Sequence, residues 1–265
     1  MALRIHNIFQ KVDQSKFMEV NITIWIILAV GTACFLTGVS KGGLGGGIGM
    51  LMTPMLSLVM PVNKAVGILL PILMLADVFT LAAYWKKWEI RWIWVLLIGG
   101  LSGVTLATYV LVNVSADLVR KALAILVFTF LLYRIFEKRI VAAQNYQVRP
   151  WHGLLAGSAS GFSSALAHAG GPPITIYLLL QRLEPSKFIA TSALFLALLN
   201  WIKVPYYYFG GLFDFPLQLQ LVYLLPLVPL GVWTGRQLVK RVDKVVFERI
   251  IIALLVISVV LLFVL

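Results

Sequence analysis

Apolar residues fill about ten runs of this chain, and short connections that carry most of the charged residues separate them. A helix needs about 20 residues to cross the hydrocarbon of a bilayer, and most of these runs are close to that length. The pattern therefore predicts an all-α polytopic membrane protein with about ten membrane segments, some of which could be re-entrant. We expect the segments at residues 22–38, 44–60, 65–85, 92–113, 119–137, 152–168, 170–182, 188–209, 217–238 and 246–265.

The second half of the chain repeats the first half, with Gly161 standing 123 residues after Gly38. At that offset Gly38, Ser40, Leu56, Lys64, Leu73, Leu75 and Tyr84 fall on Gly161, Ser163, Leu179, Lys187, Leu196, Leu198 and Tyr207, and Asp77 falls on Asn200. Five segments in each copy is an odd number, so the second copy must cross the bilayer in the opposite direction. Inverted repeats of this kind are typical of secondary transporters.

The repeat divides the chain into four parts. We expect a polar, roughly amphipathic N-terminal segment at 1–21 that is retained, a first repeat at 22–137, a cytoplasmic linker at 138–151 and a second repeat at 152–265. The segment 1–21 has no apolar stretch that ends in small residues, so it does not resemble a secretory signal.

Composition supports a membrane protein, because 61% of the residues are apolar, 12% are charged and the mean hydropathy is +0.96. The net charge of +12 comes from basic residues in the connections between apolar runs, which is how inner membrane proteins mark their cytoplasmic side. This distribution argues against nucleic acid as a partner and predicts a multi-pass protein of the cytoplasmic membrane with both ends outside. The single cysteine, Cys34, excludes a disulfide framework within one chain.

Each half contains an interrupted, glycine-rich stretch, at residues 40–47 and 163–173. Unwound backbone at membrane depth is tolerated where protein or a cavity satisfies it, and a helix that begins there directs N–H groups toward an anion. Close helix packing is the alternative, because several glycines have small-xxx-small spacing, and we favour packing for Gly99, Gly103, Gly231 and Gly235. Such faces would also allow a homodimer.

Ionisable residues inside apolar segments are costly, so each of them is a functional candidate. Lys203 and Lys41 could pair with an anion, although a lysine can also extend to the membrane surface or mark the cytoplasmic side. His168 and Asp77 could carry protons, and pairing with a lysine is the alternative for Asp77. The candidates for substrate binding are Ser40, Lys41, Gly42, Gly43, Gly45, Gly46, Ser163, Ser164, His168, Gly170, Gly171, Asn200, Lys203 and Tyr207.

The segments 38–47 (GVSKGGLGGG) and 168–173 (HAGGPP), with Lys187 and 200–203 (NWIK), resemble the TauE/SafE sulfite exporter family, also called the toluene sulfonate uptake permease family. The resemblance covers the chain from about residue 25 to its end. It implies transport of a small sulfur-containing anion, such as sulfite or a sulfonate like sulfoacetate, and in many members export. It does not choose among these substrates.

Other functions remain open from the sequence alone. An anion channel would have the same composition, and a small carboxylate would suit the same residues. An enzyme is disfavoured because His6, His152 and His168 are too scattered for a catalytic or metal cluster, and no nucleotide-binding motif is present, so we expect no cofactor. The expected protein is a secondary transporter that works by alternating access, with proton coupling as an open question.

Overall fold

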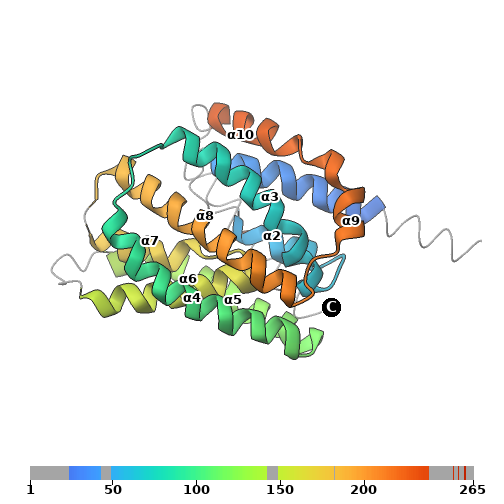
Figure 1. Ribbon diagram of the computed structural model, residues 1–265, viewed down its shortest axis with the longest axis horizontal. Coiled ribbons are helices and arrows are strands. Elements are labelled where there is room, and N and C mark those ends of the chain that lie inside the picture. Colours follow the sequence, from blue (N-terminus) through green and yellow to red (C-terminus); the bar gives the residue numbers. More distant parts are fainter. Residues whose placement is uncertain are drawn as a thin grey trace, which may run out of the picture.

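The computed structural model describes residues 24–42, 49–141, 149–181 and 183–238, and single positions at 253, 256 and 260. All regular structure within these ranges is helical, as expected from the pattern of apolar runs. After an N-terminal helix, Ile24–Gly42, the elements are α2 (Gly49–Leu56), α3 (Val62–Ala83), α4 (Ile90–Asn113), α5 (Ala116–Val141), α6 (Pro150–Ala167), α7 (Gly171–Leu180), α8 (Pro185–Phe209), α9 (Phe215–Gln220), η1 (Val222–Leu224) and α10 (Leu227–Leu238) (Figure 1).

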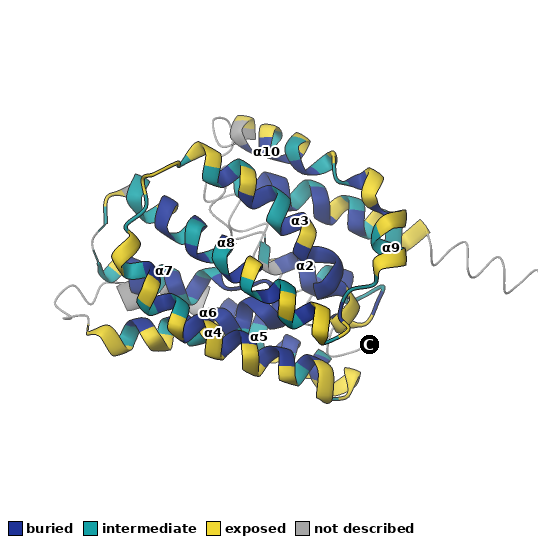
Figure 2. Ribbon diagram, viewed as in Figure 1, coloured by how far each residue is buried: buried dark blue, intermediate teal, exposed yellow. Residues whose placement is uncertain are grey.

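The surface of the helix bundle is apolar, as a bilayer requires. Within the described ranges, four helices are long and apolar enough to cross a membrane: Ile24–Gly42, Val62–Ala83, Ile90–Asn113 and Ser186–Phe209. Large apolar side chains along α4, such as Trp94 and Ile98, remain about two-thirds exposed at 63% and 66%. Figure 2 shows the same outer face of α4 in yellow, while buried residues line the interior. Exposed apolar surface on this scale marks contact with lipid or protein.

The second helix of each half is short. At about 1.5 Å per residue, the 8 residues of α2 and the 10 residues of α7 reach no more than about halfway across a hydrocarbon layer of about 30 Å. They occupy corresponding places, because Gly49 falls on Pro172 at the repeat offset. Neither helix spans the bilayer alone.

Three predicted boundaries are wrong. The predicted segment 217–238 is divided into α9, η1 and α10. Pro226, which has no N–H to donate to the carbonyl of Val222, lies at the break between η1 and α10. The predicted segment 119–137 ends too early, because α5 continues to Val141, and the linker at 138–151 stays a prediction. Both interruptions begin later than predicted: the first helix stays helical through Gly42, and α6 stays helical through Ala167. Residues 1–21 and nearly all of 246–265 lie outside the described residues.

Glycines allow two pairs of helices to pack backbone against backbone. A Cβ at Gly103 would overlap the carbonyl of Ser158, so α4 and α6 approach closely there. A Cβ at Gly38 would overlap the carbonyl of Val228, so the N-terminal helix and α10 do the same. The same applies to Gly42, Gly99, Gly157, Gly161, Gly231 and Gly235. The packing interpretation of Gly99, Gly103, Gly231 and Gly235 is confirmed, and a homodimer stays a prediction.

Two ion pairs join the halves at positions related by the repeat. Lys64, near the start of α3, donates to Asp214 before α9 at 3.0 Å. Lys187, at the equivalent place in α8, donates to Glu89 before α4 at 2.7 Å. Each ion pair therefore connects the third segment of one half to the loop that precedes the fourth segment of the other half.

Candidate functional site

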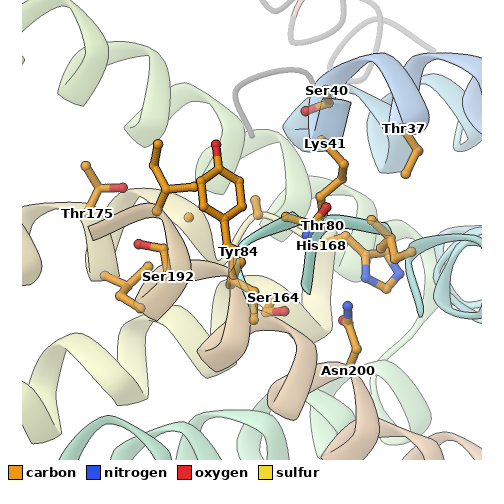
Figure 3. Close-up of a pocket in the computed structure, with 18 of the residues that line it drawn as sticks. Thr37, Ser40, Lys41, Thr80, Tyr84, Ser164, His168, Thr175, Ser192 and Asn200 are labelled. Atoms are coloured by element: carbon orange, nitrogen blue, oxygen red, sulfur yellow. The ribbon is translucent and has the colours of Figure 1, made fainter. Parts of the chain in front are cut away.

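A cavity of about 200 Å³ lies among the N-terminal helix, α3, α6, α7 and α8. Polar side chains from both halves of the chain point into it (Figure 3). The sequence-predicted residues that line it are Ser40, Lys41, Gly42, Ser164, His168, Gly171 and Asn200. Seven of the candidates, separated by up to 160 residues in sequence, thus share one cavity inside the helix bundle.

Lys41 supplies a positive charge on the cavity wall. Its Nζ donates to Oδ1 of Asp77 at 2.5 Å, and the amide nitrogen of Asn200 donates to Oδ2 of the same carboxylate at 2.5 Å. Asp77 is buried behind the wall, whereas Lys41 and Asn200 line the cavity. The carboxylate therefore orients both residues that an entering molecule would contact. It pairs with Lys41, which was the alternative to proton transfer, and a role of Asp77 in proton coupling stays a prediction.

Lys203 is fully buried and does not line the cavity. Its Nζ donates to the Ser164 carbonyl at 3.2 Å, to the Ser164 Oγ at 3.1 Å and to Nδ1 of His168 at 3.0 Å. These three acceptors use all three N–H groups of the ammonium. In this conformation Lys203 holds Ser164 and His168 in place instead of facing a substrate.

The ring of His168 is fixed from both sides. Its Nε2 lies 2.9 Å from the carbonyl oxygen of Val66, which can only accept, so Nε2 carries the proton and Nδ1 accepts from Lys203. The residue caps the end of α6 with a left-handed backbone, φ 53°, which turns the chain toward α7. His168 thereby connects the cavity wall to the start of α3.

The start of α7 offers fewer backbone donors than the sequence suggested. Helix N-termini present four free N–H groups, but Pro172 and Pro173 have none. Gly171 and Ile174 keep theirs, and both residues line the cavity. The oriented peptide dipoles of α7 still favour an anion at this end, although α7 is short.

Three other candidates make local contacts and do not line the cavity. Ser163 donates to the Ala159 carbonyl of its own helix at 2.7 Å, and the Gly170 carbonyl accepts from Ser160 at 2.5 Å. Tyr207 is fully buried and donates to the Ala165 carbonyl at 2.5 Å. Gly43, Gly45 and Gly46 lie outside the described residues, so their proposed role stays a prediction.

The cavity also contains residues that were absent from the predicted set. They are Thr37, Thr80, Tyr84, Thr175 and Ser192 among the polar ones. Two of them could have been found from the repeat, because Thr80 is equivalent to Lys203 and Tyr84 is equivalent to Tyr207. Thr37 precedes Lys41 by one helical turn, a weaker signal.

Apolar side chains also line the cavity. They include Ile174, Phe188, Ile189 and Leu196, and Phe188 directly follows Lys187 of the Lys187–Glu89 ion pair. A molecule with a charged group near Lys41 and a small apolar part near Phe188 would fit both regions. Among the described residues, no group of three His, Cys, Asp or Glu side chains could hold a metal ion.

Comparison with known protein families agrees with this architecture. The family model described as "Sulfite exporter TauE/SafE" matches residues 30–262, which is most of the chain. No curated protein and no solved structure matches the sequence. The matched range contains every residue that lines the cavity.

Proposed function

Because this chain belongs to the TauE/SafE sulfite exporter family, we propose that it exports a small sulfur-containing anion, sulfite or an organic sulfonate such as sulfoacetate, through the cavity described above. Family membership and the apolar helices make the chain a multi-pass membrane transporter of the sulfite-exporter type. The choice of substrate and the mechanism are the proposal. We place the protein in the cytoplasmic membrane on the distribution of its basic connections.

The observation that carries the proposal is the Lys41 ammonium on the wall of a cavity within an apolar bundle. A lone cation at such depth is costly unless it is paired, and Asp77 pairs it from behind. Its cavity-facing side remains available to a sulfonate or sulfite oxygen. Lys203 lies behind the cavity wall. When both lysines are protonated, their two positive charges exceed the single negative charge of Asp77.

Hydroxyl and amide groups complete an environment suited to an oxyanion. Ser40 and Ser164 line the same cavity as Lys41, and Gly171 contributes the N–H at the start of α7. Each can donate a hydrogen bond to an anion's oxygens in place of water. The transported group would thus exchange its hydration shell for protein donors.

We propose that transport proceeds by alternating access between two inverted repeats. In support, the glycine contact between the N-terminal helix and α10 has its equivalent between α6 and α4. The equivalent residues Asp77 and Asn200 touch each other directly, as expected for residues close to a two-fold pseudo-symmetry axis.

The equivalent residues at the two ends of the bundle have different environments, which also favours this mechanism. Phe188 and Ile189 line the cavity, whereas their counterparts Ala65 and Val66 are completely buried. This asymmetry is expected for one conformation of an alternating pair, open toward the Lys187–Glu89 end and closed at the other. By charge, the open end is the cytoplasmic one, where an exporter loads its substrate.

The test compares ligand stabilisation with flux. Sulfite, sulfoacetate, ethanesulfonate and acetate are each added to the purified protein, and a ligand at 100 times its dissociation constant stabilises the folded state by about 2.7 kcal/mol. We expect a shift with a sulfur anion, and saturable uptake of that anion into liposomes that contain the protein.

The matched control is the double variant Lys41→Met with Asp77→Leu, which removes the cation without leaving its carboxylate unpaired. It should fold and should lose the shift. If acetate alone stabilises the protein, the substrate is a carboxylate and not a sulfur anion. If the flux rises without saturation, the protein is a channel. Either result would contradict the proposal.

A further inference from the structure

Tyr84 and Tyr207 occupy equivalent positions of the two halves but have opposite environments. Tyr207 is fully buried near the end of α8, whereas Tyr84, directly after α3, is half-buried and lines the cavity. Since the two residues are 123 positions apart, the same chain geometry presents one tyrosine to the protein interior and the other to the open space. This difference lies at the two ends that alternating access would open in turn.

Tyr207 closes its end of the bundle through a hydrogen bond. Its hydroxyl donates to the Ala165 carbonyl near the end of α6, and its ring packs edge-on against Phe213 at 6.1 Å and against His168 at 6.5 Å. The backbone is also closely packed there, because a Cβ at Gly67 would overlap the Leu212 carbonyl. These contacts join α8 to α6, and Tyr207 is completely buried between them.

The equivalent of Ala165 in the first half is Gly42, the last residue of the N-terminal helix. Gly42 and Tyr84 both line the cavity. Among the described residues, the Tyr84 hydroxyl makes no hydrogen bond, so the contact equivalent to Tyr207 with Ala165 is not formed. The two groups that would make it face the same open space.

We propose that Tyr84 and Tyr207 are reciprocal gates of the transport path. In the conformation described here, Tyr207 bonds to the Ala165 carbonyl and closes the Lys64–Asp214 end, while Tyr84 is free and the Lys187–Glu89 end is open. In the other conformation, Tyr84 donates to the Gly42 carbonyl and closes the cavity, and Tyr207 leaves Ala165. This inference rests on the proposed alternating access between the repeats.

The reporter is cysteine accessibility in a background where Cys34, the only cysteine of the chain, is replaced by alanine. Val66→Cys reports opening at the Lys64–Asp214 end, because Val66 is buried there, and Ile189→Cys reports opening at the other end. A membrane-impermeant maleimide labels each variant in sealed vesicles of known orientation. We expect Ile189→Cys to react rapidly and Val66→Cys slowly.

The two tyrosine variants should have opposite effects on Val66→Cys. Loss of one hydrogen bond changes a conformational equilibrium by about 2- to 10-fold, so Tyr207→Phe should raise the labelling rate by that factor and Tyr84→Phe should lower it. Tyr208→Phe is the matched control, since Tyr208 is an exposed residue of the same helix, and it should leave the rate unchanged. Phenylalanine keeps the ring and its packing, so folding is expected to survive.

Failure of the gates differs from failure of the proposed function. If substrate shifts the labelling of Val66→Cys and Ile189→Cys in opposite directions, but both phenylalanine variants behave like Tyr208→Phe, the gate proposal is wrong and alternating access stands. A rise of Val66→Cys labelling in Tyr84→Phe would also overturn the gates. If substrate shifts neither reporter and flux is absent, the transport proposal itself is wrong.

Discussion

The two halves of the chain carry the lysines of the site, Lys41 and Lys203, at positions that the repeat does not relate. In the first half, Lys41 is the last but one residue of the first helix and bonds to Asp77. In the second half, Ser164 stands in the place of Lys41, Asn200 in the place of Asp77, and the cation is Lys203 on α8, where the first half has Thr80. Both cations bond within their own half, one to a carboxylate and the other to neutral acceptors.

The packing of the two halves is much more alike than their chemistry. Gly38 and Gly161 make the same kind of backbone contact with a partner helix, and Lys64 and Lys187 make the same kind of ion pair. A duplicated chain can retain the contacts that fold it while its polar residues change independently. The result is one site shared across the interface of the halves, with its negative charge entirely in the first half.

The first prediction tests this difference in charge by replacing Asp77 and its equivalent, Asn200, by alanine in separate variants. Asp77→Ala leaves Lys41 without its counter-charge and should destabilise the protein by about 3 to 5 kcal/mol, the usual effect of breaking a buried ion pair. Asn200→Ala removes one hydrogen bond to a charged group and should cost about 1.5 to 3 kcal/mol. The measurement is the free energy of unfolding in detergent.

Asp117→Ala supplies the control for the carboxylate. Asp117 bonds to Lys121 on the exposed surface of α5, and loss of such a pair should cost less than about 1 kcal/mol. Adding Lys41→Met to an Asp77→Leu variant should restore most of the lost stability. Equal effects of Asp77→Ala and Asn200→Ala would show that the charge asymmetry between the halves has no energetic weight.

The second prediction sharpens the similarity of packing. Gly38→Ala and Gly161→Ala each place a Cβ against a backbone carbonyl of the partner helix, on α10 and α4 respectively. Both should destabilise the protein by about 1 to 3 kcal/mol, the range for overpacking, because a backbone cannot move aside as a side chain can. Thermal unfolding of the two variants measures the effect.

Gly49→Ala is the matched control, since a Cβ there meets nothing within 4 Å. It should leave stability unchanged or raise it by about 0.5 to 1 kcal/mol, because alanine is the better helix former. A large effect at Gly38 with none at Gly161 would contradict the equivalence of the two contacts.

The long helices were predictable from the sequence because a buried membrane helix leaves a continuous apolar run. The expected segment 92–113 lies within α4, and 188–209 lies within α8, each within three residues of its bounds. Boundaries set by backbone chemistry were less accessible. The division of 217–238 depends on whether tertiary contacts compensate the missing N–H of Pro226, and hydropathy carries no information on that point.

The site was predictable where a residue was costly in its surroundings, as for Lys41, His168 and Asn200. The sequence could not tell that Lys203 lies behind the wall and not on it, because that depends on which acceptors fold around its Nζ. The hydroxyl residues were harder, since Thr37 and Thr175 are inexpensive anywhere in a membrane helix. Tyr84 became identifiable only through its equivalence to Tyr207.

The smallest expected effect compares the two ion pairs that join the halves. The bond from Lys64 holds the pKa of Asp214 below its ordinary value of 3.8, and the bond from Lys187 lowers the pKa of Glu89 in the same way. The folded state therefore binds fewer protons than the unfolded state just below pH 4, so stability is present above that range and is lost as the pH falls through the folded pKa. Both pairs are partly exposed. The Lys64–Asp214 pair should contribute less than about 1 kcal/mol, and the Lys187–Glu89 pair should act in the same direction. The free energies of unfolding of the wild type and of Lys64→Met should differ at pH 7 and converge as the pH falls below the folded pKa of Asp214. If Lys187→Met converges with the wild type in the same way, the two halves are equivalent in their electrostatics as well. If the difference between Lys64→Met and the wild type does not depend on pH, Lys64 acts through packing and not through its charge.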